Sequence, residues 1–330
     1  MPAILVTGGA GYIGSHTVRA LAAAGHDLIV YDSLEKGHPA AVANCRLVVG
    51  DVADGLKLDR VFREFRIDAV VHFAAFIEAG ESVREPAKYF RNNTAGTLSL
   101  LEAMVRNEVA QIVFSSTAAV YGEPQRIPIH ESDRKQPTNP YGLSKLMIEE
   151  MLDAFEAAYG LRSISLRYFN AAGAAPDGLL GEDHHPETHL IPLILQVALG
   201  QRESIGIFGT DYPTRDGTCI RDYIHVTDLA DAHLLALEKL RAGELRNVYN
   251  LGNGSGFTVR EVIEVARKVT GAPIDAVEQP PRPGDPAQLV ASSDRAWQDL
   301  GWRPQYADLE SIVATAWRWK GAHPQGYGDR

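Results

Sequence analysis

Two residues, Tyr141 and Lys145, have the types and spacing that predict proton transfer. They stand four positions apart in Tyr141-Gly142-Leu143-Ser144-Lys145, so a helix of about 3.6 residues per turn places both side chains on one face. A phenol with a pKa of about 10 is a poor base at neutral pH, and bringing that pKa to about 7 requires roughly 4 kcal/mol. A neighbouring ammonium group favours the phenolate. The pair therefore predicts a general base, although a surface cation beside an aromatic ring would show the same spacing.

A glycine-rich segment near the N-terminus predicts a dinucleotide site. The run Thr7–Gly14 contains four glycines between an apolar stretch and an amphipathic one. Glycines there allow a tight turn and let the backbone approach a pyrophosphate at the positive end of a helix. Asp32 comes 18 residues after Gly14, where its carboxylate either caps a turn or binds an adenosine ribose diol and repels a 2′-phosphate. The pattern favours NAD over NADP, and a cationic nicotinamide ring would further favour the Tyr141 phenolate.

Short β-branched runs alternate with amphipathic stretches through the first half of the chain. Strands are expected at Ala3–Thr7, Asp27–Tyr31, Arg46–Val49, Asp68–His72, Ala110–Ser115 and Arg162–Arg167. Helices are expected at Tyr12–Ala24, Leu56–Phe65, Ala87–Arg106 and Tyr141–Tyr159. Near-continuous apolar strands with helices between them indicate a parallel sheet covered on both faces. The predicted fold class is therefore α/β, a doubly wound parallel sheet of the Rossmann type with a smaller mixed α/β C-terminal lobe.

The alternation loosens after Arg167. Asn170–His189 is rich in Gly, Pro, His and acidic residues and is predicted to be a long loop. Helical patterns return at Leu190–Leu199, Thr227–Leu240 and Thr258–Thr270. We therefore expect a nucleotide-binding domain at 1–168 and a second lobe at 169–330. Part of 221–252, including Arg221–Val226, is expected to return to the main sheet.

Several residues follow predicted strands, and in an open α/β sheet the carboxyl ends of the strands line the ligand crevice. Asp51-Val52 would meet an adenine, and Phe73-Ala74-Ala75 would pass along the diphosphate of a dinucleotide. Asn93 lies on the helix that follows. Thr117 comes after the fifth strand, where its hydroxyl could hold a substrate oxygen beside Tyr141. Each of these residues could instead be an ordinary loop or packing residue.

Composition excludes several classes of function. The 330 residues carry 32 basic and 42 acidic side chains, a net charge of −10, which argues against a broad nucleic-acid surface. Cys45 and Cys219, the only cysteines, cannot form a disulfide framework or a cysteine zinc site and fit a reducing compartment. No apolar run approaches the roughly 18 residues that a membrane span needs. We expect a cytoplasmic protein with neither a nucleic-acid nor a membrane partner, and no metal.

Taken together, these residues resemble the extended short-chain dehydrogenase/reductase superfamily and, within it, the UDP-sugar 4-epimerases. The resemblance runs from Ile4 to Tyr327 and includes Thr117–Gly122, Leu166–Asn170 and Arg221–Val226. It implies that tightly bound NAD accepts the C4 hydride of the sugar while the Tyr141 phenolate removes the 4-hydroxyl proton. The 4-keto sugar then turns over and takes the hydride back on its other face, interconverting UDP-galactose and UDP-glucose.

The resemblance also implies a set of site residues. Tyr141, Lys145 and Thr117, which replaces the usual Ser, would be catalytic. Cofactor-binding residues would be Gly8, Gly11, Tyr12, Ile13, Gly14, Asp32, Ser33, Leu34, Asp51, Val52, Phe73, Ala74, Ala75, Asn93, Lys145 and Tyr168. Substrate-binding residues would be Thr117, Tyr141, Asn170, His189, Leu190, Phe208, Arg221, Tyr223, Arg282, Asp285 and Leu289. The two arginines suit a diphosphate, because a guanidinium fork pairs with phosphate oxygens, and Asp285 would bind the uridine ribose.

Three residues depart from the family pattern. Ile77 stands where many members have a Lys near the cofactor diphosphate, and His189 stands where Asn is common beside the substrate. Leu289 aligns with a bulky Tyr that excludes N-acetylated sugars. We therefore hypothesise activity on UDP-N-acetylglucosamine, which undetectable turnover of that substrate beside robust turnover of UDP-galactose would contradict.

Other functions are compatible with the same resemblance. A 4-epimerase of another UDP sugar, such as an N-acetylhexosamine or a pentose, is the main alternative. A nucleotide-sugar dehydratase would have carboxylates directly after Thr117, where this chain has Ala118 and Ala119. A non-catalytic NAD sensor would be expected to lack Tyr141 or Lys145. The helices Ala87–Arg106 and Tyr141–Tyr159 form the dimer interface in most relatives, so a homodimer is expected.

Overall fold

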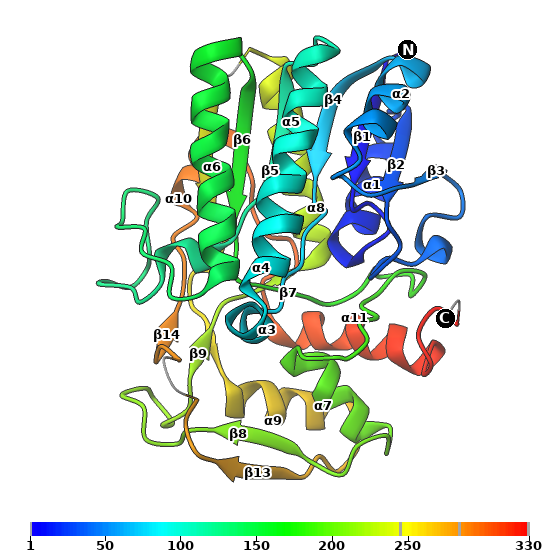
Figure 1. Ribbon diagram of the computed structural model, residues 1–330. Coiled ribbons are helices and arrows are strands. Elements are labelled where there is room, and N and C mark those ends of the chain that lie inside the picture. Colours follow the sequence, from blue (N-terminus) through cyan, green and yellow to red (C-terminus); the bar gives the residue numbers. More distant parts are fainter. Residues whose placement is uncertain (1, 244–245, 283–284, 329–330) are drawn as a thin grey trace.

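The computed structural model describes residues 2–243, 246–282 and 285–328. Its larger part contains seven parallel strands: β1 (Ala3–Thr7), β2 (Leu28–Asp32), β3 (Arg46–Val49), β4 (Ile67–His72), β5 (Gln111–Ser115), β6 (Arg162–Arg167) and β11 (Arg246–Asn250). They form one sheet in the order β11-β6-β5-β4-β1-β2-β3, in the upper half of Figure 1. The order reverses at β1, which lies between β2 and β4. This confirms the predicted doubly wound sheet and places the ligand crevice at the carboxyl ends of these strands.

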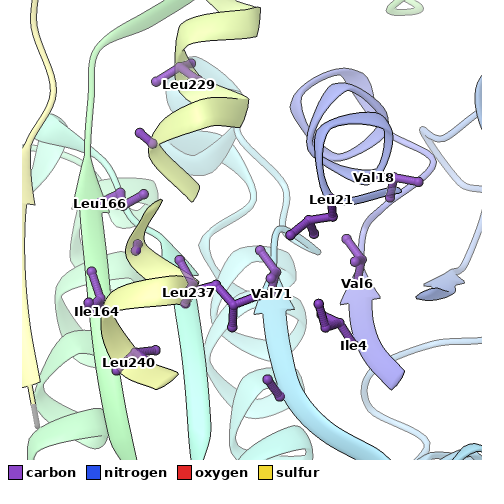
Figure 2. Packing of buried hydrophobic residues seen from close by; sticks show 14 of the residues in the cluster. Ile4, Val6, Val18, Leu21, Val71, Ile164, Leu166, Leu229, Leu237 and Leu240 are labelled. Atoms are coloured by element: carbon purple, nitrogen blue, oxygen red, sulfur yellow. The ribbon is translucent and has the colours of Figure 1, made fainter. Parts of the chain in front are cut away.

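Helices cover both faces of this sheet. The main ones are α1 (Tyr12–Ala23), α2 (Gly55–Phe65), α5 (Gly96–Arg106), α6 (Pro140–Tyr159) and α8 (Val226–Arg241). Ile4 and Val6 of β1 pack in one cluster with α1 and α8, part of which Figure 2 shows. Leu5 packs in a second cluster with α2, α5 and α6. Alternate side chains of β1 therefore serve opposite cores, which explains why the strand is an uninterrupted apolar run.

The predicted strands and helices of the main sheet agree closely with the structure, with one local difference. All six predicted strands are present within one residue of their expected bounds. The predicted helix Ala87–Arg106 is divided into α4 (Pro86–Tyr89), a wider π-helical turn at Phe90–Ala95, and α5. Within that turn the Asn93 side chain accepts from the Phe76 N–H (2.9 Å) and donates to the Phe76 carbonyl (3.0 Å). These tertiary hydrogen bonds explain why the helical pattern is interrupted.

The smaller lobe, in the lower half of Figure 1, has its own core. Its helices are α7 (Leu190–Ala198), α9 (Val259–Thr270) and α11 (Leu309–Ala322). Its strands are short: β8 (Ile205–Phe208) pairs with β13 (Ala276–Gln279), and β9 (Ile220–Arg221) lies between β12 (Phe257–Thr258) and β14 (Gln288–Leu289). Across the described ranges, no helix has the length and apolar character needed to cross a membrane.

Two expectations about the second half need correction. Arg221–Val226 does not return to the main sheet, because Arg221 belongs to β9 and the next residues form β10 (Tyr223–His225). β10 pairs instead with β7 (Asn170–Ala172), which is the start of the predicted long loop. The segment that does join the main sheet is β11, which pairs with β6. The chain thus leaves the sheet after β6 and comes back to it some eighty residues later.

Candidate active site

One large cavity, of about 710 Å³, lies where the carboxyl ends of the main strands face the smaller lobe. This volume is within the range of small-molecule sites. It is lined from the main sheet by the turn after β1 and the ends of β2, β4 and β5, and from the lobe by residues such as Arg221 and Arg282. The cavity is therefore located where the sheet topology predicts a ligand.

The turn between β1 and α1 brings backbone, not side chains, to the cavity. Gly8 has a φ of +70°, and a Cβ there would lie 2.5 Å from the Ala74 nitrogen. A Cβ on Gly14 would lie 2.2 Å from the Gly8 carbonyl oxygen. Gly11 is the N-cap of α1 and faces the cavity. Gly8 and Gly14 are therefore required for the turn to pack this closely against Ala74 and the start of α1. The turn presents its peptide groups at the helix N-terminus, which fits a dinucleotide diphosphate.

Asp32 lies at the end of β2 with its carboxylate already positioned by the backbone. Its two oxygens accept hydrogen bonds from the N–H groups of Ala10 and Leu34, each at 2.9 Å. Burial raises the pKa of Asp32, and these two hydrogen bonds partly oppose that effect. Each oxygen keeps a free lone-pair direction, and the residue lines the cavity. The arrangement fits a ribose diol.

Tyr141 enters the cavity from the first turn of α6. The helix begins sharply there because Asn139 caps it, accepting from the Gly142 N–H at 2.9 Å, and Pro140 occupies its first turn. Burial raises the pKa of Tyr141 to about 12, although a hydrogen bond with Thr117 lowers it. Tyr141 and Thr117 are thus brought together as predicted. The chain by itself, however, holds the phenol in its protonated form.

Lys145 is almost completely buried one turn further along α6. Its Nζ donates to the Ser115 carbonyl (2.9 Å) and lies 4.9 Å from the centre of the Phe114 ring. Burial lowers the pKa of Lys145 to about 7, against the attraction of the Glu149 carboxylate. A phenolate at Tyr141 would in turn favour the ammonium form of Lys145, because opposite charges stabilise one another.

A buried polar network stands behind these residues. Glu149 and Arg167 form an ion pair in which both side chains are 2% exposed. Glu149 also accepts from the Ser116 hydroxyl (2.6 Å), and Arg167 donates to the Tyr121 hydroxyl (2.7 Å). The network fixes the segment after β5 on which Thr117 lies, and sequence patterns alone gave no signal for it.

The lobe side of the cavity presents charged side chains that already contact one another. The Arg221 guanidinium hydrogen-bonds the Asp285 carboxylate, and the Arg282 guanidinium lies 4.0 Å from the centre of the Phe208 ring. Arg221, Arg282 and Asp285 all line the cavity. The two arginines are therefore in position for an anionic ligand.

Most predicted site residues line this cavity. Those that do are Gly8, Gly11, Tyr12, Ile13, Gly14, Asp32, Ser33, Asp51, Val52, Phe73, Ala74, Ala75, Thr117, Tyr141, Lys145, Tyr168, Asn170, His189, Arg221, Arg282, Asp285 and Leu289. Five do not. Leu34 packs on the first core cluster, Asn93 is buried behind Phe76, and Leu190 and Tyr223 belong to the lobe core. Phe208 does not line the cavity itself, but its ring packs against Arg282, which does.

Lys36 also lines the cavity, although no sequence motif indicated it. Lys36 donates to the His185 carbonyl (3.2 Å), and its Nζ is 3.4 Å from a Glu78 oxygen. It thus brings a cation close to Ile77, where the family pattern has a Lys. Its position four residues after Asp32 was the only available signal, because the contact joins segments far apart in the sequence.

A glycine turn after β1, an acid at the end of β2 and a Tyr–Lys pair on α6, converging on one cavity, define a protein of the short-chain dehydrogenase/reductase class. The sequence profile of the NAD dependent epimerase/dehydratase family matches residues 4–252. The chain belongs to this family, and it is an enzyme that uses NAD.

Individual relatives are similar over the whole chain. A UDP-glucose 4-epimerase of Halalkalibacterium halodurans is 58% identical over 325 residues, 98% of this chain and 97% of the relative. The crystal structure of a Brucella ovis UDP-glucose 4-epimerase in complex with NAD is 47% identical, with a TM-score of 0.94 and coverage of 96% and 98%. A UDP-Glc/GlcNAc 4-epimerase of Campylobacter jejuni is 43% identical, with a TM-score of 0.86 and coverage of 98% and 100%.

Proposed function

We propose that this enzyme is a UDP-glucose 4-epimerase that interconverts UDP-galactose and UDP-glucose. The observation that carries the proposal is the meeting of Tyr141, Thr117 and Lys145 in a cavity that also contains the glycine turn and the lobe arginines. Two relatives that are similar over the whole chain are UDP-glucose 4-epimerases, which supports the choice of substrate.

In the proposed reaction the Tyr141 hydroxyl exchanges a proton with the 4-hydroxyl of the sugar, and Thr117 holds the same oxygen. NAD, when bound, supplies the hydride acceptor and donor, and its oxidised ring supplies a positive charge. Burial keeps the pKa of Tyr141 high, so the phenol becomes a competent base only when that charge and the Lys145 ammonium act together. Tyr141 then keeps the proton while the sugar is in its 4-keto form.

The lobe would hold the UDP half while the sugar turns. Arg221 and Arg282 would bind the diphosphate, Asp285 the uridine ribose, and Asn170 and His189 would lie beside the sugar. Burial disfavours a charged His189, but the carboxylates of Glu182 and Glu187 raise its pKa to about 10. The hydroxyl groups of the sugar are neutral, so the sugar is held less firmly than the charged diphosphate. It can therefore present either face of C4 while the nucleotide contacts remain.

The replacement Tyr141→Phe tests this proposal. Purified protein should convert UDP-galactose to UDP-glucose without added nucleotide, as followed by chromatography. Because a positioned acid–base group contributes about 10²- to 10⁴-fold, the variant should lose activity by that factor. It should also retain its NAD. Tyr159→Phe, at the exposed end of the same helix, should behave like the wild type. Full activity in Tyr141→Phe would refute the assignment.

Leu289 favours UDP-N-acetylglucosamine as a second substrate. It is half-buried on the cavity wall, beside the apolar cluster that contains Ala118 and Val120, and leaves more room than a Tyr would. The Campylobacter jejuni relative is a UDP-Glc/GlcNAc 4-epimerase. Leu289→Tyr should reduce turnover of the N-acetylated sugar and retain that of UDP-galactose. Equal loss of both activities would show that Leu289 does not select between them.

We also propose a cytoplasmic homodimer with a NAD-binding domain at 1–168 and a UDP-sugar-binding lobe at 169–330. Both cysteines are unpaired thiols, as expected in a reducing compartment. Leu98 of α5 and Leu143 and Met147 of α6 are 38–40% exposed, although they are large and apolar. A four-helix interface would bury them. Light scattering of Leu143→Glu should then give a monomer where the wild type gives a dimer.

A further inference from the structure

The loop before α7 brings together four side chains, of which the proposed reaction uses only His189. Glu182, His184, Glu187 and His189 each offer one ligand atom, and these atoms all lie within 4.8 Å of one another. Three of the four, Glu182, His184 and His189, also line the main cavity. The cluster is thus compact, accessible from the cavity and made of two imidazoles and two carboxylates.

The distances within the cluster suit a shared cation. The His189 Nδ1 is 2.7 Å from a Glu182 oxygen and 3.4 Å from a Glu187 oxygen, and the His184 Nδ1 is 3.1 Å from the same Glu182 oxygen. Ligands bound to Zn²⁺ at about 2.0–2.2 Å in a tetrahedron lie roughly 3.4 Å apart. To accept the ion, the shortest contact would lengthen from 2.7 Å to about 3.4 Å, and the widest ligand separation, at most 4.8 Å, would shorten.

The His189 Nδ1 gives an independent indication. This atom is buried and lies 2.7 Å from a Glu182 oxygen, but none of its contacts within the described part of the chain has hydrogen-bond geometry. A buried ring nitrogen without a hydrogen bond is rare in folded proteins. A metal ion between the nitrogen and the carboxylates would satisfy it.

The third observation is the negative charge of the Glu182 carboxylate in the cavity wall. Glu182 is 7% exposed, and its carboxylate faces a cavity whose other polar groups suit anionic ligands. A buried carboxylate is stable only when a cation compensates it. Without metal, His189 supplies one such cation, because its pKa is raised to about 10. A divalent ion that displaces this proton would cancel the charges of both Glu182 and Glu187.

We propose that Glu182, His184, Glu187 and His189 bind one Zn²⁺ ion per chain. Imidazole nitrogens combined with carboxylate oxygens are typical zinc ligands, whereas Mg²⁺ and Ca²⁺ prefer oxygen alone. We expected no metal because two cysteines cannot form a zinc site. That argument does not apply to ligands from histidine and glutamate. The site does not depend on the proposed epimerase activity.

The ion would fix the cavity wall between the glycine turn and the lobe. The ring of Tyr12, on the first turn of α1, contacts the His184 ring edge-on with the ring centres 6.2 Å apart. The Tyr12 hydroxyl donates to the Gly173 carbonyl (2.6 Å). A metal-bound loop would therefore hold both Tyr12 and His189 in place, and the ion should raise the melting temperature.

Zinc binding to the full-length protein tests the proposal directly. The protein is freed of metal with a chelator and titrated with ZnCl₂ alone in a calorimeter, and Co²⁺ is then used to report the coordination by its visible absorption. We expect one ion per chain and a tetrahedral Co²⁺ spectrum. His184→Asn and His189→Asn should each weaken binding at least 10-fold and abolish that spectrum.

His185→Asn is the matched control, because His185 is an exposed histidine of the same loop outside the cluster. It should bind zinc like the wild type. If an asparagine variant does not fold, Glu187→Gln replaces it, with a smaller change in volume. Failure of the wild type to bind zinc, or equal binding by wild type and His184→Asn, would overturn the proposal and show a set of imidazolium–carboxylate pairs only. Neither result affects the test of Tyr141.

Discussion

The two sides of the cavity present different parts of the chain. On one side, the backbone wall consists of Gly8, Gly11 and Gly14, where the glycines leave peptide groups uncovered. On the other, the side-chain wall consists of Arg221, Arg282 and Asp285, whose charged groups reach the cavity from the lobe. The first wall depends on the absence of side chains and the second on their presence. Substitutions should therefore have unequal effects on the two walls.

The largest effect is expected when a side chain is added to the backbone wall. In Gly14→Ala the new Cβ would lie 2.2 Å from the Gly8 oxygen, so the turn must move. Because a displacement of about 1 Å at a binding site can cost roughly 100-fold in rate, activity should fall at least that far. Measured NAD content should fall with it. Gly321→Ala, where a Cβ meets nothing within 4 Å, should have neither effect.

Removal of a charge from the side-chain wall should have a somewhat smaller effect. Hydrogen bonds to charged groups contribute about 1.5–3 kcal/mol, so Arg221→Ala should raise the KM for UDP-galactose about 10- to 100-fold. The kcat should change less, because Tyr141 is not disturbed. Arg215→Ala is the control, since Arg215 pairs with Glu261 away from the cavity. An unchanged KM would remove Arg221 from the substrate site.

Acid should weaken the support of the backbone wall. The His72 Nδ1 is hydrogen-bonded to Thr7 (2.6 Å), the last residue before the glycines, and burial lowers the pKa of His72 to about 3. An unfolded histidine takes up its proton at about pH 6.5. The stability that neutral His72 contributes is therefore complete well above that pH and is lost as the pH falls towards 3. Between pH 7.5 and 5 the loss from His72 is about 2 kcal/mol.

Urea unfolding at pH 7.5 and 5.0 measures this effect. His72→Gln should be less stable at pH 7.5 and should lose about 2 kcal/mol less than the wild type on acidification. His26→Gln, at a more exposed histidine, should keep the wild-type difference. The same dependence on pH in His72→Gln would show that other groups control acid unfolding.

The smallest effect is expected at Arg282. Its guanidinium lies over Phe208 at the rim of the cavity and is more exposed than Arg221. An exposed ion pair contributes only about 0.2–1 kcal/mol because water screens it, so loss of the diphosphate contact in Arg282→Ala should raise the KM only about 2- to 5-fold. Arg303→Ala removes a similar contact, 4.3 Å from the Trp297 ring, and should not change the KM. An effect as large as that of Arg221→Ala would show that water does not screen the contact between Arg282 and the diphosphate.

The same contrast explains how much of the molecule could be predicted. The strands of the main sheet are buried on both faces, so each is a distinct apolar run, and the glycine turn follows the first of them. The lobe strands β9, β12 and β14 have two residues each, too few to show any periodicity. Arg221–Val226 was consequently assigned to the wrong sheet.

Contacts between distant segments were equally invisible in the sequence. The Asn93 hydrogen bonds to Phe76, which divide a predicted helix, join residues 17 positions apart. The Glu149–Arg167 pair and the approach of Lys36 to Glu78 have no local pattern. Sequence motifs thus identified the glycine turn and the Tyr–Lys pair. The charged groups around them, such as Glu149 and Lys36, could be placed only from the fold.

The return of β11 to the main sheet has a consequence for the stability of fragments. β11 closes one border of the sheet by pairing with β6, and α8 covers one face. A polypeptide cut at residue 168 would lack both. Its β6 would have a row of unpaired peptide groups, a template for intermolecular strand pairing. The isolated first half should therefore precipitate on expression, and co-expression with the second half should restore its solubility.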